Sequence, residues 1–123
     1  MIEPNIVVTR GSGMRLHALD VWLRDPAVLT DCDALRSLLY RAAAAGNATV
    51  LADEFYVFPN GAVTGVLLLA QSHLSIHTWP ELRLANVDLL TYGRVDADAV
   101  LEVLQTSLRP ERVSLVAITR GVG

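Results

Sequence analysis

The chain has 123 residues, of which 52% are hydrophobic and 19% are charged, so we expect one folded domain over residues 1–123 and exclude a disordered chain. The formal net charge of −3 and the scattered arginines offer no basic stripe to a phosphate backbone, which argues against a nucleic-acid partner. No apolar run approaches the roughly 20 residues that span a bilayer, and the N-terminus lacks a signal-peptide pattern, so we expect a cytoplasmic protein with no membrane contact.

The predicted elements begin with a strand over residues 15–23, which is rich in bulky and β-branched side chains. Apolar residues at helical spacing then predict a helix that starts near Asp31 and stops at Gly46. Two strands follow, over 48–58 and 63–70, with a Pro-Asn-Gly turn between them. The unbroken apolar run of the second strand predicts that it is buried on both faces.

The rest of the chain continues this alternation. A strand that starts at Ser72 and a strand over 84–92 precede a helix over 96–108 and a closing strand over 112–119. Two βαββ-type halves predict an α+β fold in which helices cover one face of a mainly antiparallel sheet. The opposite face then needs a cover, and pairing as a homodimer is the simplest way to supply it.

The stretch AQSHLSIHTWPE concentrates reactive side chains directly after a core strand. Alternation places His73, Ser75, His77 and Trp79 on one face. The spacing of the two histidines suits a metal site on a helix rather than on a strand, and no third histidine or cysteine lies nearby, so we expect no metal. A hydrolase triad would also need an acid and an oxyanion site, and Ser72 lacks a glycine-flanked elbow.

The chain contains no lysine, so all ten of its cationic side chains are arginines. This excludes pyridoxal phosphate as the cofactor, because that cofactor is held as a lysine Schiff base. A chain without lysine can still make a carbonyl electrophile from a serine. The hydroxyl attacks the preceding carbonyl, the ester eliminates, and hydrolysis leaves a pyruvoyl group on the new N-terminus. Ser72, at a strand end, is the candidate for this conversion.

The segment VTGVLLLAQSHLSIHTWPE, followed by NVDLLTYG, resembles the prokaryotic S-adenosylmethionine decarboxylases. Their pattern runs roughly GVSG, an apolar strand, ESHLxIHTWPE and then VDxFTCG, and they are pyruvoyl enzymes of polyamine synthesis. The resemblance implies cleavage between Gln71 and Ser72. The products would be a β chain of residues 1–71 and an α chain of residues 72–123 with a pyruvoyl N-terminus, which would form a Schiff base with the substrate's amine. The expected homodimer would then consist of two processed αβ protomers.

The resemblance also implies roles for individual side chains. His77 matches the family's histidine of self-processing, and Thr64 stands where the GVSG motif has its serine. Tyr92 replaces the cysteine that donates a proton during catalysis, and a phenol can also donate one. Glu81 and Trp22 are candidates for contacts with the substrate.

Two departures from the family pattern bear on function. Gln71 replaces a glutamate, and Tyr92 is larger than the cysteine that it replaces. A smaller site favours L-ornithine or L-arginine, to which members of the wider family have switched, over S-adenosylmethionine as substrate. Decarboxylation of S-adenosylmethionine for spermidine synthesis is the alternative. A homologue that stays unprocessed and regulates a catalytic partner is a third possibility, against which the retention of Ser72, Thr64 and His77 argues.

Overall fold

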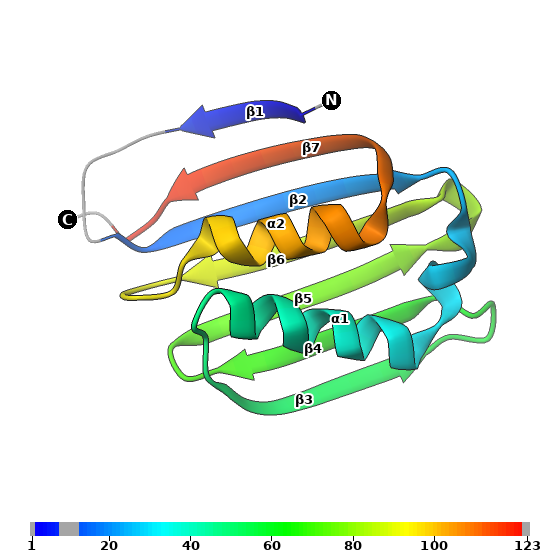
Figure 1. Cartoon of the computed structure of the whole chain (residues 1–123), viewed down its shortest axis with the longest axis horizontal. Coiled ribbons are helices and arrows are strands. Elements are labelled where there is room, and N and C mark those ends of the chain that lie inside the picture. Colours follow the sequence, from blue (N-terminus) through cyan, green and yellow to red (C-terminus); the bar gives the residue numbers. More distant parts are fainter. Residues whose placement is uncertain (1, 8–12, 122–123) are drawn as a thin grey trace.

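The computed structural model describes residues 2–7 and 13–121, and within them the strands form one seven-stranded sheet (Figure 1). The elements in chain order are β1 (Ile2–Val7), β2 (Arg15–Leu23), the 3-10 helix η1 (Pro26–Thr30), α1 (Cys32–Ala45), β3 (Val50–Val57), β4 (Val63–Leu69), β5 (Ser72–Trp79), the 3-10 helix η2 (Pro80–Leu82), β6 (Leu84–Thr91), α2 (Ala97–Leu108) and β7 (Pro110–Thr119). The strand order across the sheet is β1-β7-β2-β6-β5-β4-β3. No helix of the described residues is long and apolar enough to cross a membrane.

The predicted α+β architecture is confirmed from residue 15 onward. Every described strand pair is antiparallel except β1 with β7, which is parallel and has Ile2 opposite Val113. Strand β1 was not predicted from the sequence. Its six residues include Pro4, which lacks an N–H for a sheet ladder, and the position of β1 at the sheet edge is where such a residue is tolerated.

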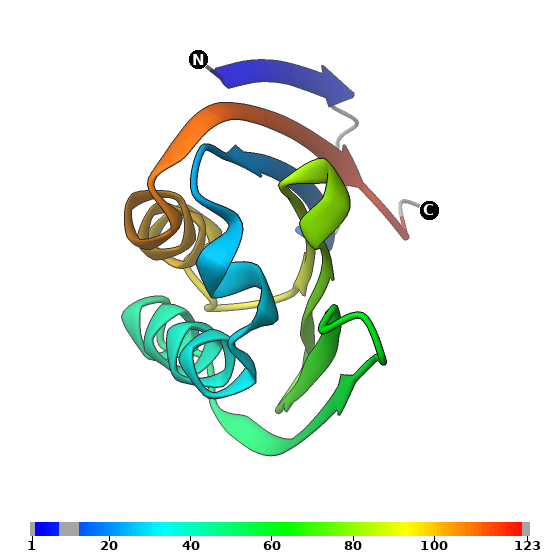
Figure 2. The same ribbon diagram turned by 90° about the vertical axis from the view of Figure 1, so that its right-hand side faces the viewer.

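Both α-helices pack on the same face of the sheet, side by side, as Figure 2 shows. Asp31 and Asp96 cap them, since each carboxylate accepts a hydrogen bond of 3.1 Å from a first-turn N–H. The buried helix residues are Leu35, Leu38, Leu39, Ala42 and Ala43 of α1 and Val100, Leu101, Leu104 and Leu108 of α2. The core therefore lies between the helices and the alternate sheet residues that face them.

The opposite face, called the open face below, has no helix over it in the described part of the chain. On β4, Leu67 is fully buried, whereas Leu68 is 52% exposed. The prediction that this strand is buried on both faces is therefore wrong for the single chain. The apolar run of β4 combines residues packed beneath the helices with residues on the open face.

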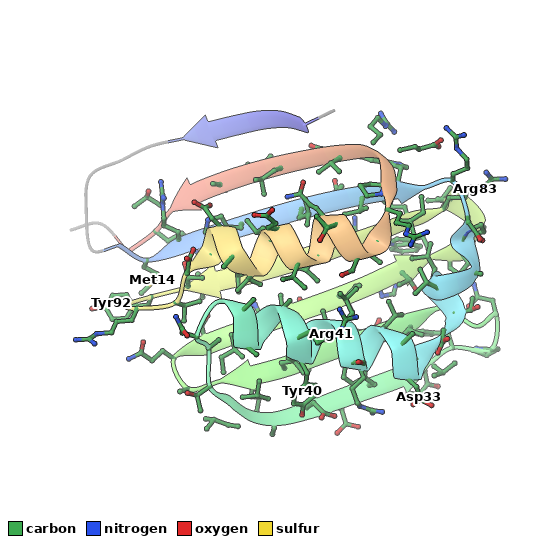
Figure 3. All side chains as sticks on the ribbon, viewed as in Figure 1. Met14, Asp33, Tyr40, Arg41, Arg83 and Tyr92 are labelled. Carbon is green, nitrogen blue, oxygen red and sulfur yellow. The ribbon has the colours of Figure 1, made fainter. Side chains whose placement is uncertain are left out.

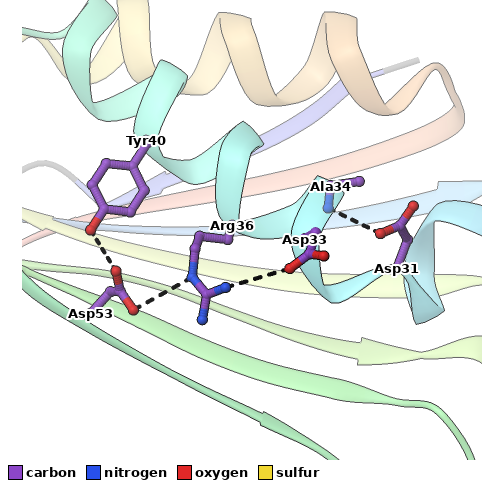
Figure 4. A network of polar contacts seen from close by, with 6 residues as sticks. All are labelled: Asp31, Asp33, Ala34, Arg36, Tyr40 and Asp53. Carbon is purple, nitrogen blue, oxygen red and sulfur yellow. Dashed lines mark hydrogen bonds and ion pairs between the residues drawn. The ribbon is translucent and has the colours of Figure 1, made fainter.

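Polar contacts attach α1 to the edge strand β3 (Figure 4). Arg36 Nε lies 3.6 Å from Asp53 Oδ1, and the Tyr40 hydroxyl donates to Asp53 Oδ2 at 2.5 Å. The Arg36 guanidinium also lies over the Phe55 ring, 4.6 Å from its centroid. Phe55 covers Gly65 so closely that a Cβ there would lie 2.1 Å from the ring. These contacts hold β3 and β4 in place at this edge.

One histidine belongs to the core rather than to the open face. His17 on β2 is 5% exposed, and its Nδ1 has no hydrogen-bond partner. Burial lowers the pKa of His17 below its ordinary value of 6.5, although a hydrogen bond with the Leu89 backbone partly opposes the shift. The folded protein therefore keeps this imidazole neutral where an unfolded chain would bind a proton.

We expect the free energy of unfolding to decrease as the pH falls below 6.5, the ordinary pKa of this side chain, because the unfolded chain then binds a proton that folded His17 excludes. His17→Leu should make the unfolding free energy less dependent on pH between about pH 7.5 and about pH 5. The measurement uses the Ser72→Ala chain, which is expected to stay uncut. Urea denaturation followed by tryptophan fluorescence gives its free energy of unfolding at each pH. His73→Gln is the control, because it replaces a histidine outside the core. An unaltered pH slope in His17→Leu would contradict the expectation.

Candidate active site

The candidate residues gather at the two ends of β5. Ser72 begins this strand, and His77 lies five residues further along it. At about 3.3 Å per residue, their Cα atoms are roughly 17 Å apart. In Figure 3, Tyr92 and Arg83, which flank the neighbouring strand β6, mark these two ends of the sheet. The structure therefore does not bring Ser72 and His77 of one chain together.

The Ser72 end contains a cavity of about 230 Å³ that is lined by Gln71, Ser72 and Tyr92. The cavity lies at the turn between β4 and β5, so the Gln71–Ser72 peptide bond is beside it. Gln71 packs against Gly93, where a Cβ would lie 2.8 Å from Gln71 Oε1, and Gly93 has a φ of 77°. A glycine after Tyr92 thus allows both this turn and the close approach of Gln71.

Ser72 Oγ is buried and has no hydrogen-bond partner. Buried hydroxyls are normally paired, because an unpaired one costs about 1–3 kcal/mol. A hydroxyl without a competing partner, next to the carbonyl that precedes it, is available for attack on that carbonyl. The environment therefore fits a serine that is converted into a pyruvoyl group.

The other end of β5 contains a hydrogen-bonded pair. Thr64 on β4 lies opposite His77 in the strand register, and its Oγ1 is hydrogen-bonded to His77 Nδ1. Aromatic rings flank the imidazole edge-on: the ring centroid of Phe58 lies 5.8 Å away and that of Trp79 lies 4.4 Å away. The imidazole is thus held through Nδ1 and through its ring, which leaves Nε2 for proton transfer.

A second cavity, of about 430 Å³, opens beside this pair and is lined by Phe58, His77, Trp79 and Glu81 among other residues. Glu81 is exposed in η2, at the rim where β5 ends. Trp22 does not line this cavity. It lies on β2, and the Arg112 guanidinium covers its ring at 3.7 Å from the centroid.

Several residues of the two cavities were not predicted from the sequence. Arg94 and Asn47 line the Ser72 cavity, and Phe58 lines the cavity beside His77. Phe58 directly precedes the Pro-Asn-Gly turn, which is the signal that could have identified it as a residue at a strand end. Among the described residues there is no cluster of three or more His, Cys, Asp or Glu side chains that could hold a metal ion.

The sequence profile of the S-adenosylmethionine decarboxylase family matches residues 15–121, which include every candidate residue named above. The chain belongs to this family. An S-adenosylmethionine decarboxylase proenzyme from Methanococcus maripaludis (strain C5) is 36% identical over 105 residues, covering 85% of this chain and 86% of that protein. A proenzyme of the same name from Hydrogenobaculum sp. is 39% identical over 110 residues, covering 87% and 81%.

The fold of a family member also matches. The crystal structure of the adenosylmethionine decarboxylase from Aquifex aeolicus has a TM-score of 0.82 and 35% identity, over 92% of this chain and 95% of that one. The protein is therefore a decarboxylase of a family whose members are made as proenzymes and depend on a pyruvoyl group.

Proposed function

We propose that the protein cuts itself between Gln71 and Ser72 and then decarboxylates S-adenosylmethionine for polyamine synthesis. The observation that carries this proposal is the buried, unpartnered Ser72 Oγ at the start of β5. The expected products are a β chain of residues 1–71 and an α chain of residues 72–123. A cytoplasmic location stays a prediction.

Self-cleavage requires the chain's own atoms and one water. Ser72 Oγ attacks the Gln71 carbonyl carbon, and the peptide bond becomes an ester. A base removes the α-proton of residue 72, the Cβ–Oγ bond breaks, and Gln71 leaves as a carboxylate. Water then hydrolyses the new α chain's N-terminus, ammonia is released, and a pyruvoyl group remains. When His77 Nδ1–H donates to Thr64 Oγ1, His77 Nε2 carries the lone pair that can take up this proton.

The separation along β5 supports a site that two chains share. A general base must approach its proton to about 2.6–3.2 Å or act through one water, so the His77 of the same chain, roughly 17 Å along the strand, is too far away. A two-fold pair that stacks its open faces about an axis running across the strands would place the Ser72 end of one chain over the His77 end of the other. The homodimer thus supplies both the cover for the open face and the missing base.

The open face at the Ser72 end suits such burial. Adjacent strands place one row of side chains in register across it, and four of the five members are leucine or isoleucine. In order across the sheet from β4 to β7, the five members are Leu68, His73, Leu90, Leu16 and Ile118. Leu68 is 52% exposed and Ile118 is 36% exposed in the single chain. Covering this row in a dimer would remove apolar surface from water.

Catalysis uses the same cavity after cleavage. The pyruvoyl group supplies the carbonyl that withdraws electrons from the substrate's α-carbon. Tyr92 lines the cavity together with Ser72, so its hydroxyl can deliver a proton to the α-carbon once carbon dioxide has left. Tyr92 is thus the candidate for the proton donor.

The cavity beside His77 supports S-adenosylmethionine as the substrate. Its Phe58 and Trp79 rings offer faces for stacking a purine, and the Glu81 carboxylate can accept hydrogen bonds from ribose hydroxyls. The relatives described above are also named for this substrate. They lend no support to the preference for L-ornithine or L-arginine, which rested on the size of Tyr92. That side chain is 44% exposed and extends from the tip of the β6–α2 loop, so it does not simply fill the cavity (Figure 3).

Denaturing gel electrophoresis of the purified protein tests self-cleavage. The unsubstituted chain should give two fragments, with the N-terminus of the smaller one blocked to sequencing by the pyruvoyl group. Ser72→Ala should stay at full length, because the attacking hydroxyl is gone. A single full-length band from the unsubstituted protein would instead support a non-catalytic regulatory homologue.

Co-expression of two defective chains tests whether the site is shared. Ser72→Ala lacks the nucleophile and His77→Ala lacks the base, so each alone should remain uncut or cleave very slowly. In a mixed dimer, His77 of the Ser72→Ala chain can serve Ser72 of the His77→Ala chain. Fragments of a size-tagged His77→Ala chain should therefore appear only in the mixture. Their absence, with mixed dimers present, would show that each chain processes itself.

Release of labelled carbon dioxide from S-adenosylmethionine, L-ornithine and L-arginine, assayed side by side, tests the substrate. We expect turnover of S-adenosylmethionine and a loss of roughly 10²–10⁴-fold in kcat for Tyr92→Phe, which should still cleave itself because Tyr92 acts only after processing. Turnover of an amino acid alone would restore the size argument from Tyr92. A fully active Tyr92→Phe would remove the phenol from the reaction.

A further inference from the structure

Hydrogen-bonded side chains cross the open face next to His77. Trp79 Nε1 donates to Asn86 Oδ1 at 2.6 Å, and Asn86 Nδ2 donates to Asp20 Oδ1 at 2.7 Å. In the strand register, Asn86 on β6 lies opposite His77 on β5 on one side and opposite Asp20 on β2 on the other. The roles assigned above make no use of Asn86 or Asp20, although both lie in the row that continues from Thr64 through His77.

The chemistry of these groups allows one arrangement of the Asn86 amide. An ionised Asp20 carboxylate can only accept a hydrogen bond, and the Trp79 indole N–H can only donate one. The amide must therefore turn its NH₂ group to Asp20 and its oxygen to Trp79. Asp20 thus sets the orientation of Asn86, and Asn86 sets the orientation of the Trp79 indole. Trp79 is 38% exposed, so without this hydrogen bond its side chain could adopt other rotamers.

The indole in turn contacts the candidate base. The Trp79 and His77 ring centroids are 4.4 Å apart with an interplanar angle of 62°, while Thr64 binds Nδ1. An indole locked in place restricts the rotation of the imidazole about this hydrogen bond. We propose that Asn86 and Asp20 are positioning residues for self-cleavage, because they hold Trp79 against His77 and so keep its Nε2 directed across the open face.

This inference rests on the proposed role of His77 in cleavage, and two substitutions of one residue test it. Asn86→Ala removes both hydrogen bonds, so we expect it to cleave roughly tenfold to hundredfold more slowly at every pH. Asn86→Asp keeps the shape of the side chain but places its carboxylate against that of Asp20. When two carboxylates share a site, the pKa of one of them is strongly raised. At low pH a proton held between the two carboxyl groups therefore restores a hydrogen bond to Asp20.

The rate of fragment formation is measured for both variants from about pH 8 to about pH 5. Each rate is divided by that of the unsubstituted chain at the same pH, because His77, Asp20 and the nearby Asp88 are further titratable side chains on this face. We expect Asn86→Asp to be as slow as Asn86→Ala at high pH and to recover toward the unsubstituted rate as the pH falls. Asn86→Ala should show no such recovery.

Two controls separate positioning from other effects. Ser114→Ala removes a hydroxyl opposite Asp20 on β7 and should leave the rate unchanged. In the uncut Ser72→Ala background, Asn86→Ala should shift the NMR resonances of the Trp79 indole N–H and the His77 ring, while Ser114→Ala should not.

Cleavage of Asn86→Ala at the unsubstituted rate would overturn the inference, and so would parallel pH profiles for Asn86→Ala and Asn86→Asp or unmoved His77 resonances. These results would leave the proposed function standing. A full-length band from the unsubstituted chain at every pH is a different failure, since it would overturn the proposed self-cleavage and with it the purpose assigned to Asn86.

Discussion

The two α-helices cover only one face of the sheet, and this asymmetry decides where chemistry can occur. Strand alternation buries Leu74, Ile76 and Thr78 of β5 beneath the helices and turns His77 and Trp79 to the open face. Polar side chains are costly in the core unless they are paired, as Thr78 is: its hydroxyl donates to the Leu29 carbonyl and accepts from the Val63 N–H. The open face can instead hold a row of polar residues beside water until another chain covers it.

The same geometry links assembly to maturation in the proposed mechanism. The nucleophile and the base lie at opposite ends of β5, so the length of the strand itself keeps them apart within one chain. A chain that has not met its partner would then keep its peptide bond intact. Pairing through the open faces would bury apolar surface and complete the cleavage site in a single event, which would make the homodimer part of the proposed chemistry.

Tyr92 stands where the family pattern has a cysteine, and the structure gives its larger side chain more room than its size alone suggests. Tyr92 is the first residue after β6, in a loop whose turn depends on Gly93. It lines the Ser72 cavity and is still 44% exposed. A phenol in this position has room to extend outward. Within one chain, the cavity with aromatic walls beside His77 lies at the other end of the sheet, so in the proposed dimer it is the partner's copy of this cavity that would adjoin Tyr92.

The sequence by itself determined the order of the α-helices and strands from residue 15 on and the reaction class. These depend on local periodicity and on one contiguous motif, SHLSIHTWPE, whose residue types are chemically distinctive. It did not reveal β1, because the pairing of that edge strand with β7 depends on a partner distant in the chain. Nor did it show that β4 has an open face, since an apolar run looks the same whether one face or both are covered.

Only the tertiary structure decided which candidate residues meet. Thr64 and His77 are 13 positions apart, and Asp20 and Asn86 are 66 positions apart, yet each pair is hydrogen-bonded across neighbouring strands. Conversely, Ser72 and His77 are close in the sequence and far apart in space, because an extended strand separates residues by about 3.3 Å at each step. Strand register, which is set by the packing of the whole sheet, brings the first two pairs together and holds the third pair apart.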